Sequence, residues 1–341
     1  MERRQNAYTG CLLGLAVGDG LGSGPERENG FLPLSSHTQM AAYACNGLLL
    51  GVTRGQLDGT MAPPVRYVAD ALGEWARRQR FDRESPVRCW ISRSPRMDFR
   101  RCQEPGVLDV LTEGRAGTME DHSSSHSGAG ALMTGAAAGM FYDPGRLGRK
   151  EIHRLAAEAA ALTHGDPAAF LSAAAMAHIL SRILFDGEED MALLTWEAGQ
   201  MLRSRFGREY HQVRRVREKL KEARNLARSK RIGREEAIEK LGCVRAEEVL
   251  AAAMYCAMTD RDLVQTMELA AKCMGRGAAA VGAVLGAKYG EEAIGDVWLE
   301  ELECRSVLQE LASDMFRGCP MSRGDRVFDI EWDEKYNADR L

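Results

Sequence analysis

The chain of 341 residues is 45% hydrophobic and 28% charged, which are ordinary values for a soluble globular protein and exclude a disordered one. We find no apolar run that approaches the roughly 18 to 20 residues of a membrane span and no leader pattern, so we expect no membrane partner. Nine scattered cysteines, odd in number and without a C-x-x-C pair, favour reduced thiols in the cytoplasm.

The first predicted element is a helix that carries a glycine at every fourth position from Gly10 to Gly22. A glycine inside a helix costs roughly 1 kcal/mol relative to alanine, so a row of them predicts close approach of another helix or of a ligand. Gly282 and Gly286 repeat this spacing late in the chain. We expect both helices to line the centre of the molecule.

The middle and the end of the chain are organised differently. Residues 77–120 mix Arg, Ser, Pro and Gly with single aromatic residues, and residues 121–130 are rich in Ser and Gly, which predicts a long surface connection. Alanine, leucine and methionine recur at helical spacing almost everywhere else. After Pro320 the chain turns polar and acidic. We predict one all-α domain over residues 1–320 and a polar tail at 321–341, either wrapped on the surface or disordered.

The net charge of −4 conceals a basic segment between Arg203 and Arg234, which holds thirteen Lys or Arg and three Glu. The rest of the chain therefore carries a net charge of −14. Such a segment could contact nucleic acid. However, Val213, Val216 and Leu220 recur at the spacing of one buried helical face. We interpret the segment as a solvated basic helix and expect no nucleic-acid partner.

Five motifs, in chain order, carry a resemblance to a known family. They are G-C-L-L-G-L-A-V-G-D-G-L-G at 10–22, S-S-H-T-Q-M at 35–40, S-G-A-G-A-L-M-T at 127–134, L-T-H-G-D-P at 162–167 and G-A-V-L-G-A-K-Y-G at 282–290. Over roughly residues 5–317 the chain resembles the ADP-ribosylglycohydrolases. The resemblance implies a single compact helical domain with a central cleft, two magnesium ions and cleavage of a glycosidic bond to ADP-ribose.

In that family a hydroxyl residue and two Asp from the second of these motifs surround the two ions, together with two Asp and a Thr from a D-x-D-T sequence that precedes the last motif. Magnesium prefers such oxygen ligands, and several carboxylates are needed to offset two dications. In this chain Ser35 keeps the hydroxyl, but Ser36 and His37 stand at the Asp positions, and the late ligands fall on Cys273–Arg276. We therefore predict that the magnesium site is lost and that no cofactor is bound.

Two acidic residues of the first motif region remain. Glu26 matches an acidic residue of the family and is our candidate catalytic residue, as a general base; the alternative is an exposed loop glutamate. We count Asp19 among the candidate ligand-binding residues but interpret it as a structural hydrogen-bond acceptor. Arg276 could stand where magnesium stood, pairing with these acids or clamping a phosphate. The alternative is that its side chain extends into solvent.

The remaining candidate ligand-binding residues lie in the third and fourth motifs. Ser127, Gly128 and Gly130 keep the glycines of a loop that could approach phosphate, although the family's Asn and Arg are absent. His164 lies in an intact T-H-x-x-P, which implies a place near the cleft. The alternative is a histidine that caps a helix end before Pro167.

His37 and Cys273 allow another metal hypothesis. The family fold would bring their positions together, and imidazole with thiolate prefers zinc or another borderline ion. Glu26 would then be a third ligand. A lone histidine and a lone cysteine are more often packing residues, and no ligand-pair spacing is present.

Three functions are therefore open. The first is a protein of the ADP-ribosylglycohydrolase fold whose cleft binds ADP-ribose or a related nucleotide or nucleoside without magnesium-dependent hydrolysis. Its partner is then the free ligand or an ADP-ribosylated protein. The second is a working glycohydrolase that uses Glu26 without metal or with a different metal. The third is a structural, crystallin-like protein that binds no nucleotide.

Overall fold

The computed structural model describes residues 2–24, 28–81, 88–101, 106–141, 148–229, 231–324 and 326–337. Its α-helices are α1 Glu2–Gly22, α2 Ser36–Asp58, α3 Pro64–Gln79, α4 Val107–Thr112, α5 Gly130–Met140, α6 Arg149–Ala161, α7 Pro167–Ser181, α8 Met191–Phe206, α9 Val213–Arg228, α10 Arg234–Leu241, α11 Ala246–Thr259, α12 Leu263–Met274, α13 Ala278–Tyr289, α14 Asp296–Glu301, α15 Arg305–Arg317 and α16 Ile330–Tyr336. These residues form only isolated β-bridges and no strand. The all-α prediction is confirmed.

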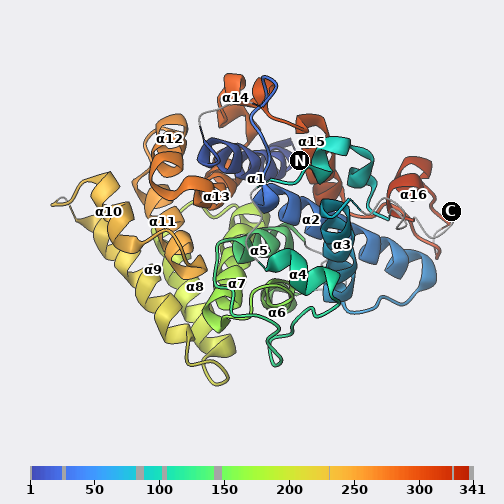
Figure 1. The fold of residues 1–341 in the computed structure, drawn as a ribbon, viewed down its shortest axis with the longest axis horizontal. Coiled ribbons are helices and arrows are strands. Elements are labelled where there is room, and N and C mark those ends of the chain that lie inside the picture. Colours follow the sequence, from blue (N-terminus) through green and yellow to red (C-terminus); the bar gives the residue numbers. More distant parts are fainter. Residues whose placement is uncertain are drawn as a thin grey trace.

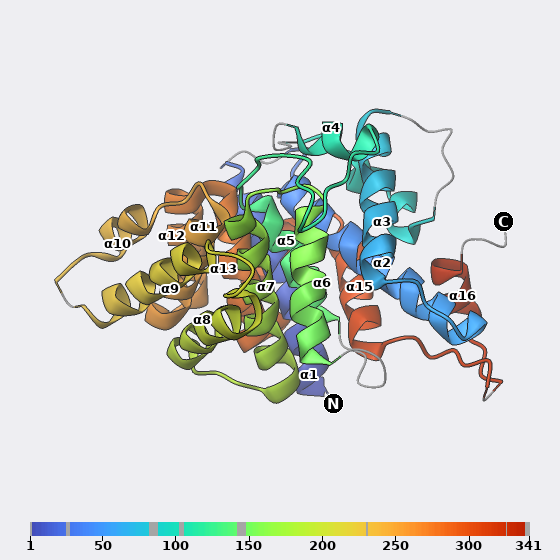
Figure 2. The same cartoon turned by 90° about the horizontal axis from the view of Figure 1, so that it is seen from below.

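The helices pack in three adjoining groups around one continuous core. In the first, α1 lies along α13 and also contacts α12, α15 and α2. In the second, α5, α6 and α7 pack on one another, and in the third α8, α9 and α11 do so. In Figures 1 and 2, α9 and α10 lie at one end of the long axis and α16 lies at the other.

The glycines of α1 serve helix packing. A Cβ atom built on Gly14 would collide with the carbonyl oxygen of Gly282, and one built on Gly286 would collide with the carbonyl oxygen of Gly10. The backbones of α1 and α13 therefore touch, because no side chain lies between them. Of the two explanations that the spacing left open, close approach of a second helix is confirmed for α1 and α13.

The segment Pro167–Asp186 corrects the expectation that no apolar run approaches the length of a membrane span. It comprises α7 and the π-turn η3 (Arg182–Asp186), and it is long and apolar enough to cross a membrane by length and composition. However, 89% of its most apolar window is buried inside the protein. Phe170 and Leu171 are fully buried, and α7 contacts α5, α6 and α8. This segment is the core helix of a globular domain, and its apolar surface faces protein.

The basic segment forms α9 as predicted. Val213, Val216 and Leu220 are buried against the core, and the arginines and lysines lie on the remaining surface. The short loop after α8 brings α9 back along α8, and α9 also packs on α11.

The C-terminal segment contains a helix that the sequence did not indicate. Trp332 and Tyr336 of α16 are 1% and 0% exposed. The indole nitrogen of Trp332 donates to the hydroxyl of Thr53 in α2 (2.8 Å), and the Tyr336 hydroxyl donates to Asp314 in α15 (2.8 Å). The described part of the tail is therefore anchored to the domain by two aromatic side chains.

Candidate functional site

Asp19, near the end of α1, holds the start of α2. Its carboxylate is fully buried. One oxygen accepts from the Ser35 hydroxyl (2.5 Å), and the other accepts from the Ser35 N–H (2.8 Å) and from the Thr38 N–H (3.1 Å) and hydroxyl (2.6 Å). A negative charge at a helix N-terminus is stabilised by the helix dipole. The structural interpretation of Asp19 is supported, because its oxygens are engaged within the protein.

The start of α2 and the last motif meet at the end of α1. A Cβ atom built on Gly22 would collide with the backbone of Gly275, so the two segments touch. The Nδ1–H of the buried His37 donates to the carbonyl oxygen of Arg276 (3.3 Å). Arg276 is half-buried in the 3₁₀ turn η4 (Gly275–Gly277). The structure thus brings together Asp19, Ser35, His37 and Arg276, as the resemblance implied.

Ser36, the first residue of α2, is buried next to these residues in the chain. Its N–H donates to the carbonyl oxygen of Arg101 (3.3 Å), so the residue is fixed from outside the helix. Ser35 is the N-cap residue of α2, and its hydroxyl oxygen accepts from the His37 N–H (3.2 Å). The hydroxyl of Ser35 therefore both caps α2 and donates to Asp19.

The loop with Ser127 and Gly128 contacts the start of α11, which in turn packs against the late motif. The Ala246 N–H donates to the carbonyl oxygen of Ser127 (2.8 Å), and Gly128 forms a bridge with Arg245. One turn further along α11, Val249 packs against Gly277 of the late motif. Gly130 is buried at the first residue of α5. The motif at 127–134 and the late motif around Gly277 therefore both lie against the first turn of α11.

We call this meeting point of the α1 end, the α2 and α5 starts, η4 and the first turn of α11 the junction. Glu26, the candidate general base, lies outside the described residues.

His164 and Cys273 are placed less centrally. His164 is 0% exposed, with its Nδ1 2.8 Å from the Thr163 hydroxyl, so it is held as a core residue before α7. Cys273 is half-exposed on the last turn of α12, and its charged neighbours are Glu235 and Lys272. Burial and the carboxylate of Glu235 raise the pKa of its thiol. The roles of both residues in ligand binding stay predictions.

The junction does not fit the family's two magnesium ions. Its described carboxylates are already engaged: Asp19 holds the start of α2, Glu247 pairs with Arg215, and Glu248 accepts from the N–H groups before α11. Arg276 adds a positive charge. Within the described ranges no three His, Cys, Asp or Glu side chains gather closely enough to hold a metal ion. Two dications beside a guanidinium would lack the carboxylates that neutralise them.

Two ion-pair clamps position the segments around the junction, and sequence reasoning missed both. Glu303 is 2% exposed, pairs with Arg101 and accepts from the Leu34 N–H (3.2 Å), which fixes the chain before α2. Arg215 of α9 pairs with Asp166 (2.6 Å) and Glu247 (2.9 Å). No spacing pattern could have shown either clamp, because the partners lie far apart in the sequence.

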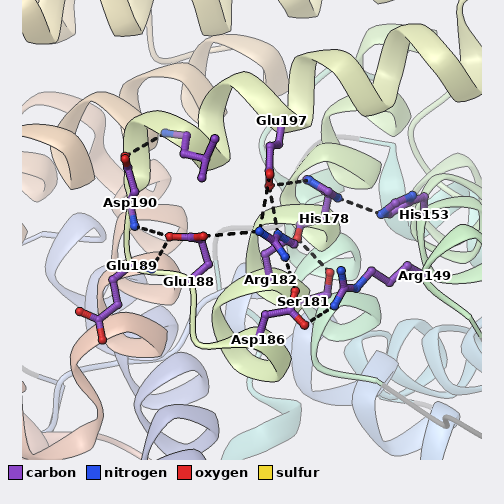
Figure 3. A network of polar contacts seen from close by, with 11 residues as sticks. Arg149, His153, His178, Ser181, Arg182, Asp186, Glu188, Glu189, Asp190 and Glu197 are labelled. Atoms are coloured by element: carbon purple, nitrogen blue, oxygen red, sulfur yellow. Dashed lines mark hydrogen bonds and ion pairs between the residues drawn. The ribbon is translucent and has the colours of Figure 1, made fainter.

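A second polar cluster lies where α6, α7 and α8 meet (Figure 3). His178 Nδ1 lies 3.1 Å from His153 Nε2, and His178 Nε2 lies 3.8 Å from a Glu197 oxygen. Arg182 pairs with Glu197 (3.0 Å) and with Asp186. Burial lowers the pKa of His153 to about 3 and that of His178 to about 4, with a further lowering from neighbouring positive charges.

Four prominent surface hollows are lined by described residues. They lie between α2 and α3, beside α1 and α13, between α8 and α9, and beside α1 and α15. None of these four is lined by the predicted site residues. The central cleft at the junction therefore stays a prediction.

These observations define an all-α protein in which the first helix packs through its glycines, and its end lies against the starts of later helices. The sequence model of the ADP-ribosylglycohydrolase family matches residues 1–324, and the chain belongs to that family. A solved structure described as an ADP-ribosylglycohydrolase-related protein complex has a similar fold, with a TM-score of 0.62 and 24% sequence identity over 93% of this chain and 99% of that one. No curated protein matches the chain in sequence.

Proposed function

We propose that the protein binds ADP-ribose, or a related nucleotide or nucleoside, at the junction and that it does so without a dinuclear magnesium site. The observation that carries the proposal is the hydrogen bond between the His37 imidazole and the backbone carbonyl oxygen of Arg276. These residues stand at family metal-ligand positions, and they still meet in space. The meeting place of the two motifs is thus kept, while its chemistry has changed from carboxylates to an imidazole and a guanidinium.

A guanidinium suits the ligand that the family binds. It has a permanent positive charge and five N–H donors in a fixed plane, which match phosphate oxygens and ribose hydroxyls. In the half-buried position of Arg276 such hydrogen bonds compete less with water than they would on an open surface. An ADP-ribosylated protein that presents the same group is a second form of this ligand.

The reduced state of the eight described cysteines accords with the cytoplasmic location that we propose.

Calorimetric titration of the purified protein with ADP-ribose, with and without EDTA, tests this function. We expect saturable binding that EDTA does not change, and no stoichiometric magnesium in metal analysis. Turnover of ADP-ribosylated arginine in EDTA that disappears in Glu26→Gln would instead support the metal-free glycohydrolase. An unchanged melting temperature at high ADP-ribose concentration, where binding must stabilise the fold, would support the structural role and contradict our proposal.

Arg276→Ala is the first specific prediction. Loss of a charge-assisted hydrogen-bonding partner should weaken ADP-ribose binding by about 1 to 3 kcal/mol, which is about 5- to 150-fold in Kd. Arg203→Ala, at an exposed arginine on α8, is the matched control and should leave the affinity unchanged. Equal affinities of the two variants would show that Arg276 does not contact the ligand.

A further inference from the structure

The groove between α8 and α9 is the largest of the four described hollows. It encloses about 660 Å³, a volume in the range of small-ligand sites. It lies toward the end of the molecule where α9 and α10 are found, on a different helix pair from those that form the junction (Figures 1 and 2). A ligand here is therefore separate from the proposed ADP-ribose site.

The α9 side of the groove carries a row of four positive charges. Arg217, Lys221, Arg224 and Arg228 follow one another at spacings of four, three and four residues, which places them on one face of the helix. The row extends about 16 Å at 1.5 Å per residue. Within the described part of the chain, none of the four has an ion-pair partner, and the Nε of Arg224 is buried without a hydrogen-bond acceptor.

Most other arginines of the chain that lie in hollows or clamps have carboxylate partners. Arg215 of the same helix has two. Arg214 and Glu218 also line the groove, and they pair with each other (2.7 Å). Pairing of a cation with an acid at the i+4 position stabilises a helix, and none of the four cations in this row has such a partner. The unpaired row therefore indicates a surface kept positive for an anion.

The α8 side of the groove supplies an aromatic platform. Trp196 lines the groove and is 47% exposed, although tryptophan is usually well buried. Gln200, one turn along α8, adds an amide that both donates and accepts hydrogen bonds. A row of phosphate-binding cations opposite an exposed indole is the combination by which proteins bind single strands, through backbone charge and base stacking.

We propose that this groove binds single-stranded nucleic acid, with Arg217, Lys221, Arg224 and Arg228 contacting successive phosphates and Trp196 stacking on a base. An acidic peptide would use the cations but would have no need for the indole. A duplex hides its base faces and would leave Trp196 without a partner. This inference reverses the sequence-based expectation of no nucleic-acid partner, and it is independent of the proposed function at the junction.

Fluorescence anisotropy with a short labelled oligouridylate, and with oligothymidylate of the same length, tests the inference in the full chain. Neutralising four phosphates should make log K fall with log salt at a slope of about −3, at about −0.7 per phosphate. Arg217→Gln with Arg224→Gln should reduce that slope to about half. Trp196→Ala should weaken binding about 10-fold, because the base loses its stacking surface, while leaving the salt slope unchanged.

The matched control is Lys150→Gln with Arg261→Gln, which removes the same charge from exposed residues outside the groove. It should bind like the unaltered protein, and all variants should keep its melting temperature. Preferences between the two oligonucleotides would separate RNA from DNA. Binding that polyglutamate or inorganic polyphosphate displaces equally well, with no loss in Trp196→Ala, would overturn the inference, as would equal losses in the groove and control variants.

Discussion

At the scale of single residues, Asp19 shows what a sequence pattern can and cannot indicate. Its place near the end of a glycine-rich helix favoured a structural acceptor, and the four hydrogen bonds to Ser35 and Thr38 support that interpretation. The contact between His37 and Arg276 was implied only by family resemblance, because 239 positions separate the two residues. The clamps on Glu303 and Arg215 had no signal at all in the spacing of residues.

Asp19→Asn should therefore destabilise the fold. The amide keeps the shape of the side chain but loses the charge that attracts the α2 N-terminus and strengthens the hydrogen bonds from Ser35 and Thr38. We expect a loss of about 1 to 3 kcal/mol in the free energy of unfolding in urea. Asp58→Asn, at the exposed far end of α2, is the matched control and should stay within about 0.5 kcal/mol. Equal effects of the two changes would contradict the capping role.

At the scale of the helices, periodicity predicted the core elements well. The glycine rows predicted close approach of another helix or of a ligand to α1, and the structure shows the helix α13. The stripe in α9 predicted its buried face. The sequence failed where a helix is defined by tertiary contacts. The short α16 has no apolar stripe of its own and is held by Trp332 and Tyr336 against α2 and α15. Short helices are marginal in isolation, so their presence depends on packing that local patterns do not contain.

Gly14→Ala should disrupt the packing of α1 on α13. The added methyl group would overlap the Gly282 carbonyl, so the two helices must separate. We expect a loss of at least about 1 to 3 kcal/mol in the free energy of unfolding. Gly73→Ala in α3 is a matched control, because the nearest obstacle to its methyl is the flexible end of Arg77 at 3.5 Å. It should gain up to about 1 kcal/mol, since alanine favours the helix. A neutral Gly14→Ala would show that the interface adjusts without cost.

At the scale of the whole molecule, the fold could be predicted because the motif order and the helical periodicity agree along the chain. The site was less predictable because catalytic chemistry depends on a few positions, and here those positions have changed. The segment 77–120, for example, supplies Arg101 to the start of α2, although its sequence predicts only a surface connection. The sequence pattern also gave no sign of the polar cluster where α6, α7 and α8 meet (Figure 3).

That interior makes stability depend on pH. His153 and His178 are buried beside each other, near Arg149 and Arg182. The carboxylate of Glu197 lies 3.8 Å from His178, and that of Asp186 also favours its protonated form. In the unfolded chain each imidazole binds a proton near pH 6.5. In the folded protein their pKa values are about 3 and about 4, so the folded state resists protonation. Between about pH 4 and pH 6.5 the unfolded state therefore binds more protons than the folded state.

The free energy of unfolding should therefore be constant above about pH 7 and fall as the pH drops from about 6.5 toward 4, by a few kcal/mol, at up to about 1.4 kcal/mol per pH unit for each histidine. His153→Gln keeps a hydrogen-bonding side chain but removes one titrating group, so the pH slope of the variant should be about half as steep, whatever its absolute stability. His211→Gln, at an exposed histidine on the loop before α9, is the matched control and should keep the full slope. Urea unfolding at several pH values measures both. If His153→Gln and the unaltered protein lose stability in parallel, the buried pair is not the source of the acid sensitivity, and the carboxylates of the ion-pair clamps become its cause.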